Sequence, residues 1–356
     1  MNGPAGTFRP RPTLADVARL AAVSEATVSR ALGRPDMVRA ETLKRVHDAV
    51  ATLDFTPAAA ARALASGRSA IIGAIVPTLA SAIFSRTLDT VQAKLSAAGY
   101  QLIVATSNYD PAGEAAVIRS LLSQGVAGLI LVGADRTPEA LALLDHAAIP
   151  IVTTWCGNAR FDAVTVNNHR AGWLAARHLI DLGHRDIGFI TNGIASNDRQ
   201  RARVAGARDA LEEAGLVLQD NRIIDQPFTL AGGRAGSAAL LSSPLPPTAI
   251  IGGIDILAIG CIAEAHERGL TVPDDFSVVG IDNLDMAAHI SPALTAVHIP
   301  TVQIGEVAAD TLIRRLKGWT MPITIDLPVE LIVRRSTGPV HRHRLPAGIR
   351  SQSEDT

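Results

Sequence analysis

This 356-residue chain has few cysteines and no long apolar run. Its two cysteines, Cys156 and Cys261, lie far apart in the sequence, so they form neither a disulfide framework nor a CxxC metal motif. Such usage is typical of a reducing compartment, where both would be small core residues. Residues 1–12 are rich in Gly, Pro and Arg without an apolar stretch, and no segment nears the length of a membrane span. The sequence therefore predicts a cytoplasmic protein.

The motifs of common enzymes are also missing. The chain contains no G-x-x-x-x-G-K loop, no H-E-x-x-H pair and no G-x-S-x-G turn. Its only glycine cluster, at 232–236, lacks the strand-first G-x-G-x-x-G spacing of a dinucleotide site. His341 and His343 fall in a polar tail, where a solvated segment is favoured over a metal site. We therefore expect no enzyme activity, no cofactor and no metal.

The composition favours a folded protein with a basic head. With 47% apolar and 19% charged residues, the chain is long enough for two or three packed domains. Its net charge of −1 conceals an asymmetry, because ten Lys and Arg stand against six Asp and Glu through Arg68, and 23 against 28 in the remaining 288 residues. A basic head on an acidic body is expected where a separate module binds nucleic acid.

Residues 13–32 have the pattern of two short amphipathic helices that meet at a Val-Ser corner, the arrangement of a DNA-binding helix-turn-helix. The first helix would begin at Thr13, whose hydroxyl can cap it. Its three-and-four spacing predicts a buried face of Leu14, Val17, Ala18 and Ala21.

The second helix would be capped by Ser24 and would bury Val28 and Leu32. At its N-terminal end, where a recognition helix meets base edges, the outward residues would be Glu25, Ala26, Ser29 and Arg30. Taken alone, this pattern fits an ordinary helical hairpin equally well.

The sequence that follows favours DNA binding. Residues 38–50 form a third amphipathic pattern, and Leu53-Asp54-Phe55-Thr56-Pro57 comes next. With these segments the chain closely resembles the LacI-type family, which includes the lac, galactose, purine and gluconate repressors. The resemblance implies an all-α helix-turn-helix head at 13–57, preceded by a disordered arm at 1–12.

The resemblance also assigns DNA contacts to individual residues. Glu25 and Ala26 occupy the positions that vary most with operator sequence, and Arg30 is the neighbouring arginine. Glutamate can accept from cytosine N4, alanine can touch a thymine methyl, and arginine can read guanine O6 and N7. Phosphate contacts and register would come from Thr13, Ser24, Ser29 and Thr42, and the DNA-binding set also includes Leu14.

An alanine-rich segment at 58–69 favours helix but is too short to hold one alone in water. It is either an interdomain linker or, as the family implies, a hinge helix that folds on operator DNA and places Leu64 in the minor groove as a wedge. Two residues depart from the family pattern, since Gly33 and Ala58 each stand where the family often has Asn.

Short apolar runs alternate with helix-length segments from residue 70 onward. Near-continuous Ile, Val and Leu indicate strands buried on both faces, hence parallel strands flanked by helices in βαβ units. The predicted strands are 71–76, 101–105, 128–132, 151–154, 187–191, 249–252 and 277–281. The helices between them include 84–98, 114–124, 170–182, 203–214 and 256–268. Glycines placed for left-handed helix caps are Gly99, Gly183, Gly215 and Gly269.

So many units exceed one doubly wound sheet, and they predict two lobes with a cleft between them over residues 70–337. The resemblance implies the same α/β core, made of two doubly wound, periplasmic-binding-protein-like lobes. Residues 338–356 are polar and have no heptad leucines, so we expect a disordered tail without the tetramerising segment of the lac repressor.

The resemblance places an effector site in the cleft. Arg203 begins an R-x-x-G motif whose arginine pairs with ligand hydroxyls or a carboxylate, and Asp282 matches the strand-end aspartate that bonds the ligand. Phe228 matches the aromatic residue that packs on the ligand face. The same cleft would be lined by Phe84, Trp155 and Asn197.

Each effector residue also has a structural interpretation. Arg203 and Asp282 could form a surface ion pair, and Phe228, Phe84 and Trp155 could simply pack in the core. Residues 254–260 resemble the family's N-D-x-x-A-x-G segment but have Ile254 in place of the asparagine that often bonds effector. We therefore expect a less polar site than that of the lac repressor.

Together these features predict a ligand-controlled transcriptional regulator, most readily a repressor, that binds a palindromic double-stranded operator as a homodimer. Segments 75–84 and 108–110 look most like the gluconate-repressor branch, which suggests a sugar or sugar acid as effector. Two other classes remain open: a solute-binding receptor without DNA function, and a sugar-converting enzyme with an appended DNA-reading domain.

Overall fold

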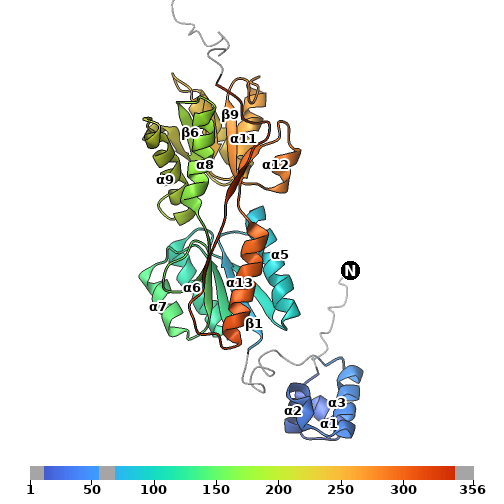
Figure 1. Cartoon of the computed structure of the whole chain (residues 1–356). Coiled ribbons are helices and arrows are strands. Elements are labelled where there is room, and N and C mark those ends of the chain that lie inside the picture. The colour runs from blue at the N-terminus through green and yellow to red at the C-terminus, as the bar shows by residue number, and fades with distance from the viewer. Residues whose placement is uncertain (1–11, 56–68, 341–356) are drawn as a thin grey trace, which may run out of the picture. The chain divides into compact units, whose positions relative to one another are not determined.

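The computed structural model describes residues 12–55 and 69–340 (Figure 1). The predicted wedge Leu64, most of the predicted hinge, the arm up to residue 11 and the tail from residue 341 lie outside these ranges. The chain divides into two compact units. The first unit runs to Ile71 and also includes the loop Gln124–Ala127, and the second unit contains the other residues. The loop is attached to Ile71 by a hydrogen bond, in which the backbone N of Ala127 donates to the carbonyl O of Ile71 at 2.7 Å.

The head unit is a small helical bundle. Its elements are α1 (Leu14–Ala21), α2 (Glu25–Gly33), the 3-10 turn Pro35–Met37 and α3 (Ala40–Thr52). A capping box starts α1, because the Thr13 hydroxyl accepts from the backbone N of Asp16 and the Asp16 carboxylate accepts from the backbone N of Thr13. Ala22 turns the chain in a left-handed conformation, with φ 54°.

One apolar cluster holds the three helices of the head together. It is made of Val17, Ala18, Ala21, Val28, Ala31, Val46, Ala49 and Phe55. Leu14 and Leu32, which the sequence pattern placed on the inner faces of their helices, are half-buried and pack at the rim of this cluster. On α2 the residue three positions after Val28, Ala31, takes the interior place that the sequence pattern assigned to Leu32. A small residue there lets α2 approach the other helices closely.

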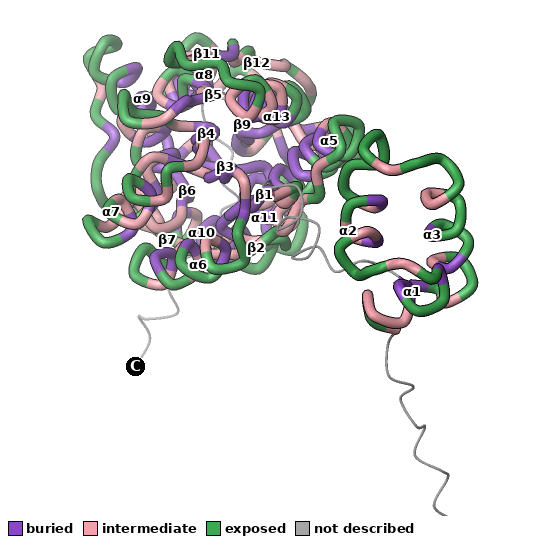
Figure 2. Tube along the Cα trace, turned by 90° about the horizontal axis from the view of Figure 1, so that it is seen from below, coloured by how far each residue is buried: buried purple, intermediate pink, exposed green. Residues whose placement is uncertain are grey.

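The larger unit contains two α/β lobes, each built on a six-stranded sheet. Lobe one has the strand order β11-β5-β4-β3-β1-β2. Its strands are β1 (Ile71–Val76), β2 (Gln101–Thr106), β3 (Gly128–Val132), β4 (Ile151–Trp155), β5 (Asp162–Val166) and β11 (Thr324–Leu327). Its helices are α5 (Ala82–Ala97), α6 (Pro111–Ser123), α7 (Pro138–His146) and α13 (Thr301–Leu316). In Figure 2 the central strands are mostly buried, and the helices around them expose their outer faces.

Lobe two has the strand order β12-β10-β9-β8-β6-β7. Its strands are β6 (Ile187–Thr191), β7 (Ile223–Asp225), β8 (Ala249–Gly252), β9 (Ser277–Asp282), β10 (Thr295–His298) and β12 (Glu330–Ile332). Its helices are α8 (Asn168–Asp181), α9 (Asp198–Glu213), α10 (Leu230–Leu241), α11 (Asp255–Glu267) and α12 (Asp285–His289). Figure 1 shows α8, α9, α11 and α12 around the second sheet.

The two-lobed prediction is confirmed, and all seven predicted strands are present. The four predicted cap glycines have positive φ, between 68° at Gly269 and 96° at Gly183. The expectation of parallel strands buried on both faces holds with exceptions: β12 pairs antiparallel to β10, and the edge strand β2 is partly exposed. Edge strands lack a neighbour on one side, so their sequence need not be continuously apolar.

The chain crosses between the lobes at three places, from β5 to α8, from β10 to α13 and from β11 to β12. Helices α8 and α9 approach each other closely at two glycines. A Cβ on Gly172 would lie 1.8 Å from the carbonyl O of Arg203, and a Cβ on Gly206 would lie 1.8 Å from the carbonyl O of His169. Only glycine permits this approach at either position. The close packing sets Arg203 beside the start of α8, at the first crossover.

Candidate DNA-binding face and effector site

The N-terminal end of α2 presents the outward face that the sequence predicted. Ser24 caps the helix, since its hydroxyl accepts from the backbone N of Thr27 at 3.2 Å. Glu25, Ala26 and Arg30 are exposed and Ser29 is half-buried. This arrangement leaves the polar face of α2 available to a partner while Val28 holds the opposite face in the head core.

A hollow of about 380 Å³ extends from this face of α2 to the 3-10 turn Pro35–Met37. It is lined by Ala26, Ser29, Arg30, Gly33, Arg34 and Met37. Met37 is 61% exposed. Arg34 and Met37 are not among the predicted DNA-binding residues, because they follow the end of α2 and no periodic pattern in the sequence marks them.

Two of the four predicted phosphate-contacting hydroxyls, those of Thr13 and Ser24, already have partners within the head. The Thr13 hydroxyl donates to the Asp16 carboxylate at 2.7 Å, and this bond helps to lower the pKa of Asp16. The hydroxyls of Ser24 and Thr27 are 2.9 Å apart. Thr42 is half-buried on α3, and Leu14 packs at the rim of the core. The observed role of Thr13 and Ser24 is to cap α1 and α2.

The core brings Arg203 of α9 and Asp282 of β9 together, although they lie 79 positions apart in the chain. Arg203 Nη1 is 3.3 Å from Asp282 Oδ1 and donates to the carbonyl O of Gly253 at 2.7 Å. Arg203 Nε donates to Asn168 Oδ1 at 3.1 Å. Both side chains of the pair are 2% exposed. The surface ion pair considered from the sequence is therefore wrong, because the pair is buried.

The structure shows a direct contact between Arg203 and Asp282, and binding of a ligand by either residue stays a prediction. Their charged groups bond to one another. A ligand that binds both side chains must replace part of this internal ion pair with its own polar groups. Neither charge can be left without a partner in so buried a place.

Two buried carboxyl groups lie together beside this arginine. Burial raises the pKa of Asp282 to about 6, against the opposing effect of the Arg203 charge. Burial and the nearby Asp282 charge raise the pKa of Asp255, at the start of α11, to about 8. Asp255 Oδ2 accepts from the backbone N of Leu284 at 2.6 Å, whereas its Oδ1 has no partner among the described residues. Burial and the neighbouring Asp282 charge therefore favour the protonated form of Asp255.

The predicted aromatic residues form two edge-to-face pairs. Phe84 and Trp155 have ring centroids 5.2 Å apart and are each 1% exposed, whereas Phe228 pairs with Tyr109 at 5.7 Å and is half-buried. Burial raises the pKa of Tyr109 to about 12. Asn197 caps α9 by accepting from the backbone N of Gln200. These contacts are structural ones, and a ligand contact by Phe84, Trp155, Asn197 or Phe228 stays a prediction.

Polar contacts join the two lobes on both sides of Arg203. Asp198 Oδ2, at the start of α9, accepts from the backbone N of Ala134 at 2.6 Å and from that of Asp135 at 3.4 Å, both after β3. Arg201 of α9 pairs with Asp135. Elsewhere Arg86 of α5 pairs with Asp285 of α12 at 3.1 Å. Sequence reasoning missed all of these contacts, because no local pattern relates the two lobes.

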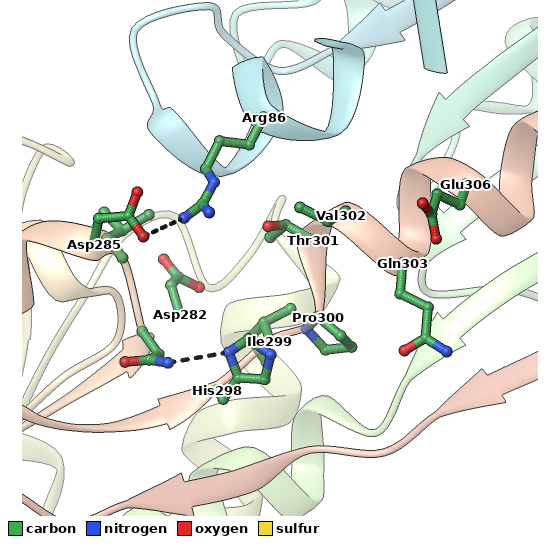
Figure 3. A pocket seen from close by; sticks show the side chains of 12 residues that line it. Arg86, Asp282, Asp285, His298, Ile299, Pro300, Thr301, Val302, Gln303 and Glu306 are labelled. Atoms are coloured by element: carbon green, nitrogen blue, oxygen red, sulfur yellow. Dashed lines mark hydrogen bonds and ion pairs between the residues drawn. The ribbon is translucent and has the colours of Figure 1, made fainter. Parts of the chain in front are cut away.

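A pocket of about 420 Å³ lies between α5, α12 and the crossover from β10 to α13 (Figure 3). Asp282 is the one predicted effector residue that lines it. The other polar residues around it are Arg86, Asn283, Asp285, His298, Thr301, Gln303 and Glu306. Asn283 and His298 are 3.2 Å apart, and burial lowers the pKa of His298. A small polar ligand in this pocket would lie beside Asp282.

Two negative findings apply to the described part of the chain, residues 12–55 and 69–340. No cluster of His, Cys, Asp or Glu there has the grouping that holds a metal ion. No described helix is both long and apolar enough to cross a lipid bilayer.

A helix-turn-helix head joined to a two-lobed α/β core defines a class of ligand-responsive DNA-binding regulators. Comparison with known families agrees. Residues 13–58 match the bacterial regulatory proteins of the lacI family, and residues 176–337 match the periplasmic binding protein-like domain. The chain is 35% identical over 340 residues to the HTH-type transcriptional repressor PurR of Edwardsiella ictaluri, covering 93% of this chain and 99% of that relative. The chain belongs to the LacI family.

Solved structures of this family have the same fold. A LacI-family regulator from Silicibacter pomeroyi aligns with a TM-score of 0.83 at 28% identity, over 92% of this chain and 99% of that one. The lac repressor dimer bound to operator and the anti-inducer ONPF aligns at 0.79 and 26%, over 92% and 100%. A complex of the regulator CelR with cellobiose aligns at 0.69 and 28%, over 92% and 100%.

Proposed function

We propose that this chain is a transcriptional repressor that binds a palindromic operator as a homodimer under the control of a small sugar or sugar acid held between the two lobes of the core. The observation that carries the proposal is the combination, in one chain, of an exposed recognition face on α2 and a buried, polar Arg203–Asp282 pair between α9 and β9. The CelR complex supports a sugar as the ligand class.

On the DNA side, Glu25, Ala26 and Arg30 would read base edges in the major groove. The residues proposed to contact the DNA backbone or support the docked helix are Thr13, Leu14, Ser24, Ser29 and Thr42. In this role Thr13 and Ser24 would act mainly through the helix N-terminal amides that they orient, since their hydroxyls are engaged within the head. The proposed minor-groove wedge, Leu64, lies outside the described residues.

On the effector side, Asp282 would accept hydrogen bonds from ligand hydroxyls, and Arg203 would donate to a ligand hydroxyl or carboxylate. Phe228, Phe84 and Trp155 would supply apolar surface for a sugar ring, with Asn197 at the start of α9. The 420 Å³ pocket beside Asp282 is within the usual range for small-molecule sites, roughly 300–1,000 Å³.

Control of DNA binding would follow from linkage. A ligand that binds one arrangement of the lobes more tightly shifts the protein toward it, and DNA affinity changes by the same coupling free energy. Because relatives are named as repressors rather than enzymes, we also propose that the chain has no catalytic activity of its own and acts in the cytoplasm, where its operator lies. The likeness to the gluconate-repressor branch, which suggests a sugar or sugar acid as the ligand, stays a prediction.

The test begins with two independent assays on the full-length protein. Selection from random DNA duplexes should enrich a palindrome, and a thermal-shift panel of sugars and sugar acids should reveal the effector. A ligand at 100 times its Kd should stabilise the core by roughly 2.7 kcal/mol. The matched control is Asp282→Asn, which should lose this shift but keep DNA selection. Recovery of no palindrome, or consumption of a sugar during incubation, would contradict the proposal.

A further inference from the structure

Asn168 is a buried polar residue at the first crossover between the lobes. It is the first residue of α8 and is 3% exposed. Its Nδ2 donates to the carbonyl O of Trp155 at 3.2 Å and to that of Val166 at 3.4 Å, both in lobe one. Its Oδ1 accepts from Nε of Arg203 in lobe two at 3.1 Å. One side-chain amide thus bonds both lobes.

The partners of this amide fix its orientation. An arginine Nε–H can only donate and a backbone carbonyl can only accept, so the amide oxygen must face Arg203 and the nitrogen must face Trp155. The amide carries its donor and its acceptor on two separate atoms, so it can bond Arg203 and Trp155 at the same time. A carboxylate could bond Arg203, but it would set an acceptor against the Trp155 carbonyl.

We propose that Asn168 is a positioning residue that couples Arg203 to lobe one, so that a change at the Arg203–Asp282 pair is transmitted to the end of strand β4. The inference rests on the proposed function for the meaning of that pair as the effector site. Because the amide is neutral, it holds the guanidinium without neutralising it, and the charge stays available to Asp282 or to a ligand.

The end of β4 is suited to receive such a change. Trp155 has φ 64°, a left-handed conformation that a tryptophan adopts only when its surroundings hold it there. The Asn168 bond to its carbonyl is one such restraint, and the edge-on contact with Phe84 of α5 is another. Loss of the amide would therefore relax this turn as well as freeing Arg203.

Hydrogen exchange on the full-length, ligand-free protein tests the proposal with a double-mutant cycle. The two reporters are the peptide 152–157 in lobe one and the peptide 199–206 in lobe two. The variants are Arg203→Gln, Asn168→Leu and the two combined. We expect each single substitution to raise exchange in 152–157 by about fivefold or more, and the double variant to exceed Asn168→Leu by less than about twofold.

A second variant separates positioning from general destabilisation. Asn168→Asp keeps the acceptor for Arg203 and loses the donor to Trp155, so exchange should rise in 152–157 while 199–206 stays protected. Asn167→Asp is the matched control, because Asn167 is exposed and its side chain only accepts from the backbone N of Arg170. It should change neither peptide.

Three results would overturn the coupling role. Arg203→Gln could leave 152–157 unchanged, the two substitutions could act independently, or Asn168→Asp could raise exchange in both reporters and in strand β8 alike. None of these readouts involves DNA or a sugar, so failure of the proposed function and failure of this inference are distinguishable.

Discussion

Two arginines show how differently the head and the core use charge. Arg30 on α2 is exposed and has no ion-pair or hydrogen-bond partner among the described residues, whereas Arg203 on α9 is 1% exposed and bonds Asn168, Gly253 and Asp282. An exposed guanidinium is free to engage a base edge or a phosphate. A buried one must have its charge and its donors satisfied within the protein.

This difference separates binding from folding. In the head, the proposed base-reading residues Glu25, Ala26 and Arg30 are exposed and lie outside the apolar cluster, so their loss should weaken binding and spare the fold. In the core, the effector residues are themselves part of the buried network, so their loss should affect both. The following substitutions test this contrast, in order of expected effect.

The largest effect is expected for Asp282→Ala. It leaves the Arg203 charge buried without its carboxylate, and breaking a buried pair in this way typically costs about 3–5 kcal/mol of unfolding free energy. Denaturant unfolding of the full chain measures this loss. In the protein that remains folded, operator binding should persist while its response to the effector disappears. Normal release of operator by the effector would show that Asp282 is purely structural.

Arg30→Ala should show the opposite behaviour. If Arg30 reads guanine, operator binding weakens by about 1–3 kcal/mol and preference relaxes at one base pair in each half-site. The unfolding transition should not move, because the side chain is exposed. Fluorescence anisotropy with the selected operator and its single-base variants measures both effects. An equal loss on every sequence would assign Arg30 to phosphate contact instead.

The paired carboxyl groups predict a pH dependence of core stability. The folded-state pKa of Asp255 is raised to about 8 and that of Asp282 to about 6, both above the usual range of an unfolded aspartate. The folded state therefore binds more protons than the unfolded state, and stability falls as pH rises from 5 to 8. Each group contributes at most about 1.4 kcal/mol per pH unit.

Asp255→Asn isolates the contribution of one of these groups. The amide cannot titrate, so the decline in unfolding free energy above pH 6 should flatten, whereas Asp54→Asn in the head should leave the profile unchanged. Denaturant melts at closely spaced pH values give the comparison. An equal slope in wild type and Asp255→Asn would mean that Asp255 is ionised in the folded protein.

The smallest effect is expected for Arg86→Ala, which removes the interlobe pair with Asp285. The two side chains are 39% and 82% exposed, and exposed pairs contribute about 0–1 kcal/mol. Asp198→Ala removes another interlobe contact, in which the carboxylate is 11% exposed and accepts from backbone N–H groups. It should destabilise the core more than Arg86→Ala in parallel melts. The reverse order would mean that the exposure of these contacts does not determine how much each contributes to the stability of the core.

Much of the secondary structure was predictable because its signals are local. Thr13 and Ser24 cap their helices through residues three positions later, and the strands of the sheet centres are continuous apolar runs. Strands β5, β7, β10, β11 and β12 were not predicted. Those at the sheet edges are short and half-exposed, so they depend on pairing with distant strands for their definition.

By itself, the sequence determined the head, the alternation of strands and helices, and the residue types of both sites, since each depends on neighbours within a few positions. Tertiary structure alone decided that Arg203 bonds Asp282 directly, that Asp282 also borders a pocket with Arg86 and His298, and that Asn168 joins the lobes. These contacts arise where the chain crosses from one lobe to the other. Helix and strand periodicity specify which face of an element is buried, but not which distant charge it will meet there.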